Sequence, residues 1–164
     1  MLFRSATKYL VLNTTAAATT GSNAFNNTAP TSSVFTTAAG STYWGNAGAT
    51  AIAYCFAAVA GYSSFGSISA NGAADNAFVF TGFLPRYVLL KRTDSTSNWI
   101  VWDTARNTYN VLGAELYPNL SNAESTVTDL DILSNGFKLR NSAFTGTWIY
   151  AAFASTPFKY SLGF

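Results

Sequence analysis

The chain has 164 residues, which is about the size of one domain. Asp, Glu, Lys and Arg make up only 10% of it, against about 25% in an average soluble protein, so Ser, Thr, Asn, Gly and Ala must form most of the surface. A net charge of +2, the absence of His and a single Cys argue against a basic nucleic-acid surface, most transition-metal sites, an imidazole-based triad and an internal disulfide.

Short runs of β-branched and aromatic residues recur along the chain between clusters of Gly, Asn, Ser, Thr and Pro. This pattern is typical of antiparallel sandwiches and barrels, and no segment shows the apolar periodicity of an amphipathic helix. The sequence therefore predicts an all-β fold, an antiparallel β-sandwich that is jelly-roll-like, with long Thr-, Ser-, Asn- and Ala-rich loops. The expected strands lie at 8–13, 50–58, 78–82, 87–92, 98–103, 129–133, 137–140 and 147–154.

The region 14–48 is a polar tract after the first expected strand, and no charged residue occurs anywhere from 9 to 74. We expect mostly loop there, with one or two short strands. A loop this long is usually functional or held by a neighbour, and we expect a subunit contact. Tyr43 and Trp44 lie in this tract, where they could stack on the ring of a glycan. The alternative, which we favour, is that they fill a subunit interface, where Tyr and Trp are enriched.

The next apolar run, 50–58, contains the single cysteine, Cys55. The run predicts a buried strand, in which Cys55 is a small buried apolar residue rather than a nucleophile. The wider uncharged stretch 47–62 is too short, and too rich in Gly, Thr and Ala, for a membrane-spanning helix of about 20 apolar residues. We therefore expect no insertion into a membrane.

Basic residues gather at the two ends of the strand expected at 87–92. Pro85 fits just before this strand, where its missing N–H does little harm. Arg86, Lys91 and Arg92 are the basic cluster of the sequence. We expect them to be solvated at the strand ends rather than to form a binding patch.

Two hairpins are predicted in the second half of the chain. The polar loop 93–98 joins two expected strands, and Asn135 with Gly136 forms a pair that tolerates the positive φ of a tight turn. Trp99 and Trp102 lie three positions apart on the strand after the first loop, so their side chains should face opposite sides of the sheet.

Two pairs of acids are candidates for the carboxylates that an enzyme acting on polysaccharide would need, namely Glu115 with Glu124 and Asp129 with Asp131. Asp129 and Asp131 share one face of their expected strand, as an acid pair or a calcium site would require. The oxygen-rich loop spacing of calcium sites does not surround them. We expect a solvated strand face instead.

A shift of the sequence by 97 positions aligns segment 50–66 with segment 147–163, with identical Thr, Ile, Phe, Ala, Ser and Gly in the same order. This indicates an internal duplication. We expect a partial first copy at 1–74 and a complete second copy at 75–164, packed as one structural domain. The first copy has no counterpart of the strands at 78–103, so another chain or the second copy should cover its sheet edges.

The chain contains the segments IAYCFA (52–57), GYSSFGS (61–67), FVFTGFLPRYVLLKRTD (78–94), DILSNGFKLR (131–140), YAAFA (150–154) and PFKY (157–160). Together these segments, over about residues 8–164, resemble a domain found in phage tail-fibre and other virion proteins. The resemblance implies a β-structured virion module, and it brings no catalytic residues to transfer.

We therefore expect a non-enzymatic structural protein of a bacteriophage particle. The leading hypothesis is a tail-fibre or receptor-binding module that contacts the host surface. A capsid decoration or cement protein is the main alternative, and a polysaccharide depolymerase is a third. The expected partners are other virion proteins, further copies of the chain in a homotrimer, and a host-surface glycan. No cofactor, metal or nucleic acid is expected.

Overall fold

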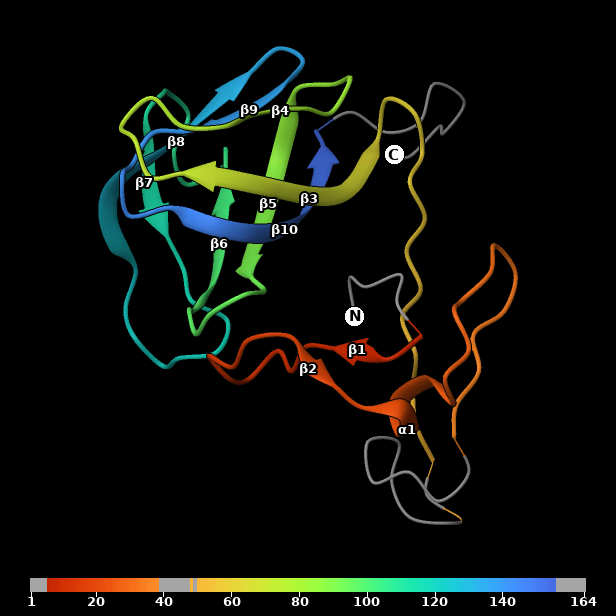
Figure 1. Cartoon of the computed structure of the whole chain (residues 1–164). Helices are drawn as coiled ribbons and strands as arrows, with labels where there is room; N and C mark the ends of the chain where they lie inside the picture. Colours follow the sequence, from red (N-terminus) through yellow and green to blue (C-terminus); the bar gives the residue numbers. More distant parts are fainter. Residues whose placement is uncertain (1–5, 39–47, 49, 156–164) are drawn as a thin grey trace.

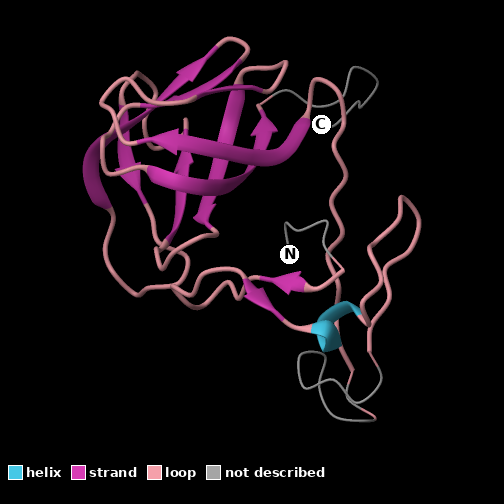
Figure 2. Cartoon of the chain, in the orientation of Figure 1, coloured by secondary structure: helices cyan, strands magenta, loops and turns pink. Residues whose placement is uncertain are grey.

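The computed structural model describes residues 6–38, 48 and 50–155, and their regular structure is almost entirely antiparallel β-strand, as predicted (Figure 2). The first main sheet contains β3 (Ser63–Asn71), β5 (Pro85–Arg92), β6 (Trp99–Asp103) and β10 (Thr145–Ala154), and the second contains β4 (Phe78–Phe80), β7 (Leu112–Glu115), β8 (Ser125–Leu133) and β9 (Gly136–Leu139). The strand orders are β3-β10-β5-β6 and β4-β9-β8-β7. The two sheets pack as a β-sandwich (Figure 1). The more specific jelly-roll description stays a prediction.

Alternation along the strands places one apolar core between the two sheets. On β10, Trp148, Tyr150 and Ala152 belong to this core, as the two-residue period of a strand requires. Val88 and Leu90 of the neighbouring strand β5 also belong to this core. Burial of each large apolar side chain stabilises the fold by about 1.5–3 kcal/mol. The second sheet contributes Val79, Leu112, Leu130, Ile132, Phe137 and Leu139.

The N-terminal arm, residues 6–20, covers part of the outer face of the first sheet. Leu10 of this arm packs with Trp99 and Ile149 in a second, smaller apolar cluster. Trp102 lies in the main core, which confirms that the two tryptophans of β6 face opposite sides. The N-terminal region contains β1 (Lys8–Tyr9), β2 (Thr19–Thr20) and the short helix α1 (Ser22–Phe25), which lie below the sandwich in Figure 1.

Lys91 joins the N-terminal arm to the sandwich. Its side chain is fully buried, and its Nζ donates hydrogen bonds to the backbone oxygens of Thr15 (2.9 Å) and Ser97 (2.5 Å). The expectation of a solvated basic cluster is therefore wrong for Lys91, because the arm covers this end of β5. Arg86 is exposed, and Arg92 is partly buried in an ion pair.

Residues 50–58 form no strand, and every residue from 50 to 60 is exposed. The prediction of a buried strand is therefore wrong there, and Cys55 is exposed rather than buried. The run has the composition of a strand, but no strand within the described residues pairs with it. The strand predicted at 8–13 is reduced to β1, and β3 and β7 form where the sequence predicts none.

Both predicted hairpins are present, β5 with β6 and β8 with β9. In the second hairpin, neither Asn135 nor Gly136 has a positive φ, so the pair does not adopt the expected turn conformation. Gly136 has a different role, because a Cβ at this position would overlap the carbonyl oxygen of Val79. This close approach lets β4 pair with β9. The six other predicted strands are present, with ends shifted by up to four residues.

The two segments that the internal repeat aligns differ in structure. Residues 147–154 lie within β10, whereas 50–57 are exposed and form no strand. β3, from the expected first copy at 1–74, pairs along its length with β10, from the expected second copy at 75–164. Both segments of the chain therefore contribute to one sheet, and β3 lies at its edge.

Candidate functional site

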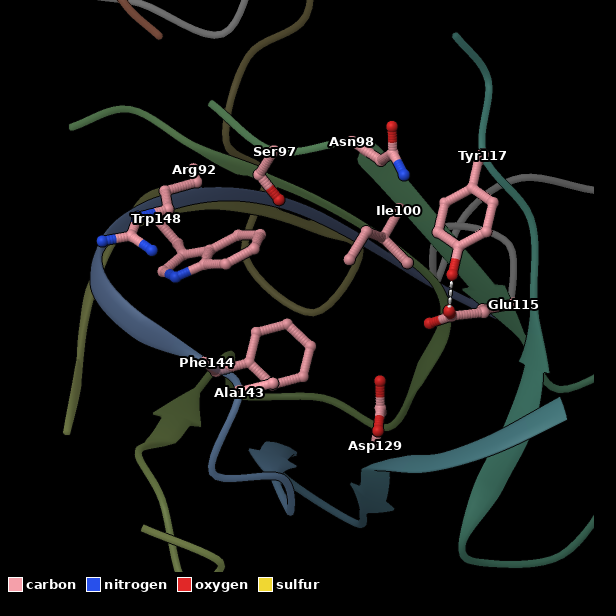
Figure 3. A pocket seen from close by; sticks show the side chains of 10 residues that line it. All are labelled: Arg92, Ser97, Asn98, Ile100, Glu115, Tyr117, Asp129, Ala143, Phe144 and Trp148. Carbon is pink, nitrogen blue, oxygen red and sulfur yellow. Dashed lines mark hydrogen bonds between the residues drawn. The ribbon is translucent and has the colours of Figure 1, made fainter. Parts of the chain in front are cut away.

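A cleft of about 240 Å³ lies between the two sheets, near the edge where they meet. At this edge Val101 of β6 donates a backbone hydrogen bond to Leu116, and Leu116 donates one back, at 2.9 and 3.0 Å. Side chains from β6, β7, β8 and β10 line the cleft (Figure 3). Glu115, Tyr117 and Asp129 form its acidic side, so the fold gathers here residues that are separate in the sequence.

An irregularity in the pairing of β7 with β8 brings Asp129 next to Glu115. Leu112 pairs with Leu130 and Ala114 pairs with Thr126, so an advance of two residues along β7 corresponds to four residues along β8. Gly113 suits this position, because a Cβ there would overlap the backbone of β8. β-bulges redirect side chains and are frequent next to functional sites. This bulge accounts for a buried acid on β8, where regular alternation would leave it in solvent.

Glu115 is the most buried acid of the cleft, with 3% of its surface exposed. Tyr117 donates its phenolic hydrogen to Glu115 Oε1, whereas Glu115 Oε2 is buried with no hydrogen-bond partner among the described residues. Burial raises the pKa of Glu115; the hydrogen bond from Tyr117 opposes this rise, and the neighbouring Asp129 carboxyl adds to it. Glu115 therefore keeps its proton more readily than an exposed glutamate does.

Asp129 is also buried, with 7% of its surface exposed. Asn141 Nδ2 donates a hydrogen bond to Asp129 Oδ1 at 2.7 Å. Within the described part of the chain, neither Asp129 nor Glu115 forms an ion pair with Lys or Arg. Two adjacent buried carboxyl groups without a cation can accept hydrogen bonds from a bound molecule.

The other walls of the cleft combine polar and aromatic groups. Ser97 and Asn98 lie at the top of the view in Figure 3, and Phe144 and Trp148, at its left, pack edge to face with ring centroids 5.0 Å apart. Arg92 lies at the rim, held in its ion pair. A small space with hydrogen-bond acceptors, donors and an aromatic wall has the composition of a site for a small polar ligand.

Neither predicted acid pair forms. Glu124 and Asp131 are bound instead in ion pairs with arginines, at 2.6 and 3.3 Å. The cleft brings together Glu115 and Asp129, one member of each predicted pair. The expected solvated strand face is wrong for Asp129, because this residue is buried beside the bulge.

No sequence pattern predicts that Tyr117 or Asn98 belongs to a site. Neither residue has a neighbour in sequence that marks it as functional. One signal for the bulge is nevertheless present: within 125–133 the apolar residues change phase between Val127 and Leu130. Such a change moves apolar side chains from one strand face to the other, which a regular strand does not do.

Tyr43 and Trp44, the predicted glycan or interface residues, lie outside the described residues. In the described ranges, His, Cys, Asp and Glu form no group of three or more that could hold a metal ion. No helix in the same ranges is long and apolar enough to cross a membrane.

A second feature is the exposed segment, residues 50–58, which runs along the side of the molecule towards β3 (Figure 1). Ile52, Tyr54 and Phe56 in this segment are 82%, 78% and 67% exposed. The ring of Phe56 contacts that of Phe153 on β10, with centroids 5.8 Å apart. Large apolar residues that are exposed close together mark surfaces for contact with other proteins.

These features define the class of the protein: an antiparallel β-sandwich with a small acid-lined cleft and an exposed apolar segment. Residues 1–157 match the model of a domain of unknown function, DUF7483, and the chain belongs to this family. No curated protein and no solved structure gives a significant match. The function must therefore be argued from the residues themselves.

Proposed function

We propose that this chain is a non-enzymatic structural module exposed on a bacteriophage particle, of the tail-fibre or receptor-binding type, which acts by contact with the host surface. The observation that carries the proposal of a module built into an assembly is the exposed segment, in which Ile52, Tyr54 and Phe56 are mostly exposed. A resemblance of the sequence to phage tail-fibre and virion modules supports the phage assignment.

The exposed segment favours a role within an assembly for two physical reasons. Burial of each of its three large side chains would stabilise a complex by up to about 1.5–3 kcal/mol. The segment is also uncharged, so a partner can cover it without removing ionised groups from water. In this proposal further copies of the chain, arranged as a homotrimer, and other virion proteins cover the segment.

Light scattering on the purified chain tests the self-association part of the proposal. We expect an oligomer for the wild type and a monomer for the variant Ile52→Ser/Tyr54→Ser/Phe56→Ser. The matched control is Tyr109→Ser, which removes an exposed aromatic residue outside the segment and should leave the oligomer intact. A wild type that stays monomeric at every concentration would contradict the homo-oligomer.

Capsid decoration is the second candidate, because the same exposed segment would equally suit contact with shell subunits. The two roles differ in position and copy number. A decoration protein would occupy many sites over the shell, whereas a fibre module would be present in a few copies at the tail. Imaging of the intact particle separates them.

A polysaccharide depolymerase is a third candidate, which the pair of buried carboxyl groups favours. Retaining and inverting glycosidases hold their two carboxyl groups about 5–10 Å apart, on opposite sides of the scissile bond. Glu115 and Asp129 instead lie on one side of the cleft, where the Asp129 carboxyl adds to the rise that burial causes in the pKa of Glu115. We therefore expect no cleavage of host polysaccharide by the wild-type chain. Cleavage that disappears in Glu115→Gln/Asp129→Asn would establish the enzyme instead.

A further inference from the structure

Glu115 Oε2 is a buried hydrogen-bond acceptor that has no donor among the described residues. A buried polar atom without a hydrogen bond costs free energy, and such atoms at a cleft wall are commonly satisfied by a ligand or by water. In Figure 3 Tyr117 holds one oxygen of the carboxyl, and the other lies towards the open space of the cleft. The fold thus fixes the direction in which Glu115 can accept a hydrogen bond.

The groups around this oxygen select the chemistry of the ligand. The carboxyl oxygens of Glu115 and Asp129 are hydrogen-bond acceptors, so they favour a molecule with several donors. Asn98 Oδ1 already accepts from Asn119 Nδ2 at 2.9 Å, so the amide N–H groups of Asn98 can donate. Phe144 and Trp148 add an apolar wall. Adjacent hydroxyl groups on a partly apolar ring match all three requirements.

The size of the cleft and the number of its ligating groups narrow the choice further. A volume of about 240 Å³ lies below the ~300–1,000 Å³ of pockets for drug-sized ligands, so a single ring fits better than a chain of rings. Calcium takes six to eight oxygen ligands, whereas this cleft offers two carboxyl groups.

We propose that this cleft binds one sugar ring, with Glu115 Oε2 and the Asp129 carboxyl accepting hydrogen bonds from adjacent ring hydroxyl groups. Asn98 donates to a ring oxygen or hydroxyl, and Phe144 and Trp148 contact the apolar face of the ring. The inference rests on the proposed function, because it names the class of host-surface molecule that the module would contact. It differs from the sequence-based expectation, which places glycan contact at Tyr43 and Trp44.

Nuclear magnetic resonance titration of the full chain tests this inference. The probes are the methyl glycosides of glucose, galactose, mannose and N-acetylglucosamine, and the readout is the indole N–H signal of Trp148 in the cleft. A single ring should bind with a dissociation constant on the order of 1 mM. Glu115→Gln replaces one carboxyl oxygen, an acceptor, with an amide NH₂ group that can only donate, and should weaken binding about tenfold to a hundredfold. Glu124→Gln, which alters an acid outside the cleft, should leave the affinity unchanged.

A second variant fills the cleft with a bulky side chain and leaves its acidic residues unchanged. Ala143 is exposed and lines the cleft, so Ala143→Trp should abolish binding in a chain that keeps Glu115 and Asp129. The inference is overturned if no glycoside binds to the folded wild type, or if both variants bind with wild-type affinity. It is also overturned if calcium chloride alone perturbs the Trp148 signal in a way that depends on Glu115. These results do not depend on oligomeric state or on location in the particle, so they can fail separately from the proposed function.

Discussion

Tyr117 donates its phenolic hydrogen to Glu115 Oε1, two positions earlier in the chain, and this bond leaves the other oxygen of Glu115 for the cleft. The arrangement depends on β7 ending at Glu115, so that Tyr117 lies just beyond the strand and can reach back. A buried carboxyl held in this way is unfavourable for stability when it is ionised. Its presence therefore suits a binding role better than a structural one.

The free energy of unfolding should depend on pH because Glu115 is protonated to different extents in the folded and unfolded chains. Burial raises the pKa of Glu115 above its ordinary value of 4.5, so between 4.5 and the raised value the folded chain holds more protons than the unfolded chain. The stabilisation is fully present below pH 4.5 and is lost as the pH rises through the folded-state pKa. Glu115→Gln should not show this loss, and near neutral pH it should be at least as stable as the wild type.

Urea unfolding of both chains from pH 4.5 upwards measures this difference. Acids whose pKa is lowered by ion pairs, such as Asp94, affect both chains equally and cancel in the comparison. Glu124→Gln serves as the control and should follow the wild-type profile. A constant difference between wild type and Glu115→Gln over this range would show that Glu115 has no raised pKa.

Gly136→Ala should destabilise the fold by about 3 kcal/mol, because the added Cβ meets the backbone oxygen of Val79 on β4 and not a movable side chain. Gly61→Ala is the control: Gly61 has open space around its Cβ position and a φ of +76°, so its cost should be about 1 kcal/mol. Thermal and urea unfolding measure both. Equal losses in the two variants would show that β4 and β9 do not approach as closely as described.

Lys91→Met should release the N-terminal arm from the sandwich, because it leaves the backbone oxygens of Thr15 and Ser97 without their buried donor. The expected loss is about 1–3 kcal/mol. Hydrogen exchange gives a local readout: the Ala18 amide, which donates to Thr93 O at 2.9 Å, should exchange faster. Arg86→Met changes an exposed cation on the same strand and should leave this amide protected. Unchanged protection in Lys91→Met would contradict the anchoring role.

Cys55 should report whether the exposed segment is covered in the assembly. Its side chain is exposed in the single chain, so a thiol reagent should label the folded monomer within the time that it labels the unfolded chain. In the homo-oligomer or in the particle, the same reagent should label Cys55 much more slowly. Equal labelling rates in the monomer and in the particle would place the interface elsewhere.

The sequence predicts the strands whose inner residues are large. β5, β6 and β10 were recognisable because residues such as Val88, Trp102 and Tyr150 alternate with outward-facing positions. β3 is different, because Ser, Gly and Ala fill most of it and resemble a loop, with Ile68 as its large core residue. The segment 50–58 shows the opposite error: its composition favours a strand, but strand formation also needs a neighbour.

The site was less predictable than the fold. The sequence identifies the acids as candidates, but regular alternation places Asp129 on the same strand face as Asp131. It does not predict that Asp129 lies next to Glu115. Their actual grouping depends on the bulge in β8 and on the close approach that Gly113 permits. Both are tertiary features, because they need the strand on the other side of the pair.

Cryo-electron microscopy of the intact particle is the direct test of the proposal that this chain is a contact module on a phage. We expect a few copies at the tail, with residues 50–58 covered by a neighbouring subunit and the Glu115 cleft open to the outside. Particles that contain no copy of the chain would contradict the proposal. Copies spread over the shell would indicate that the chain is a capsid decoration protein and not a host-contact module.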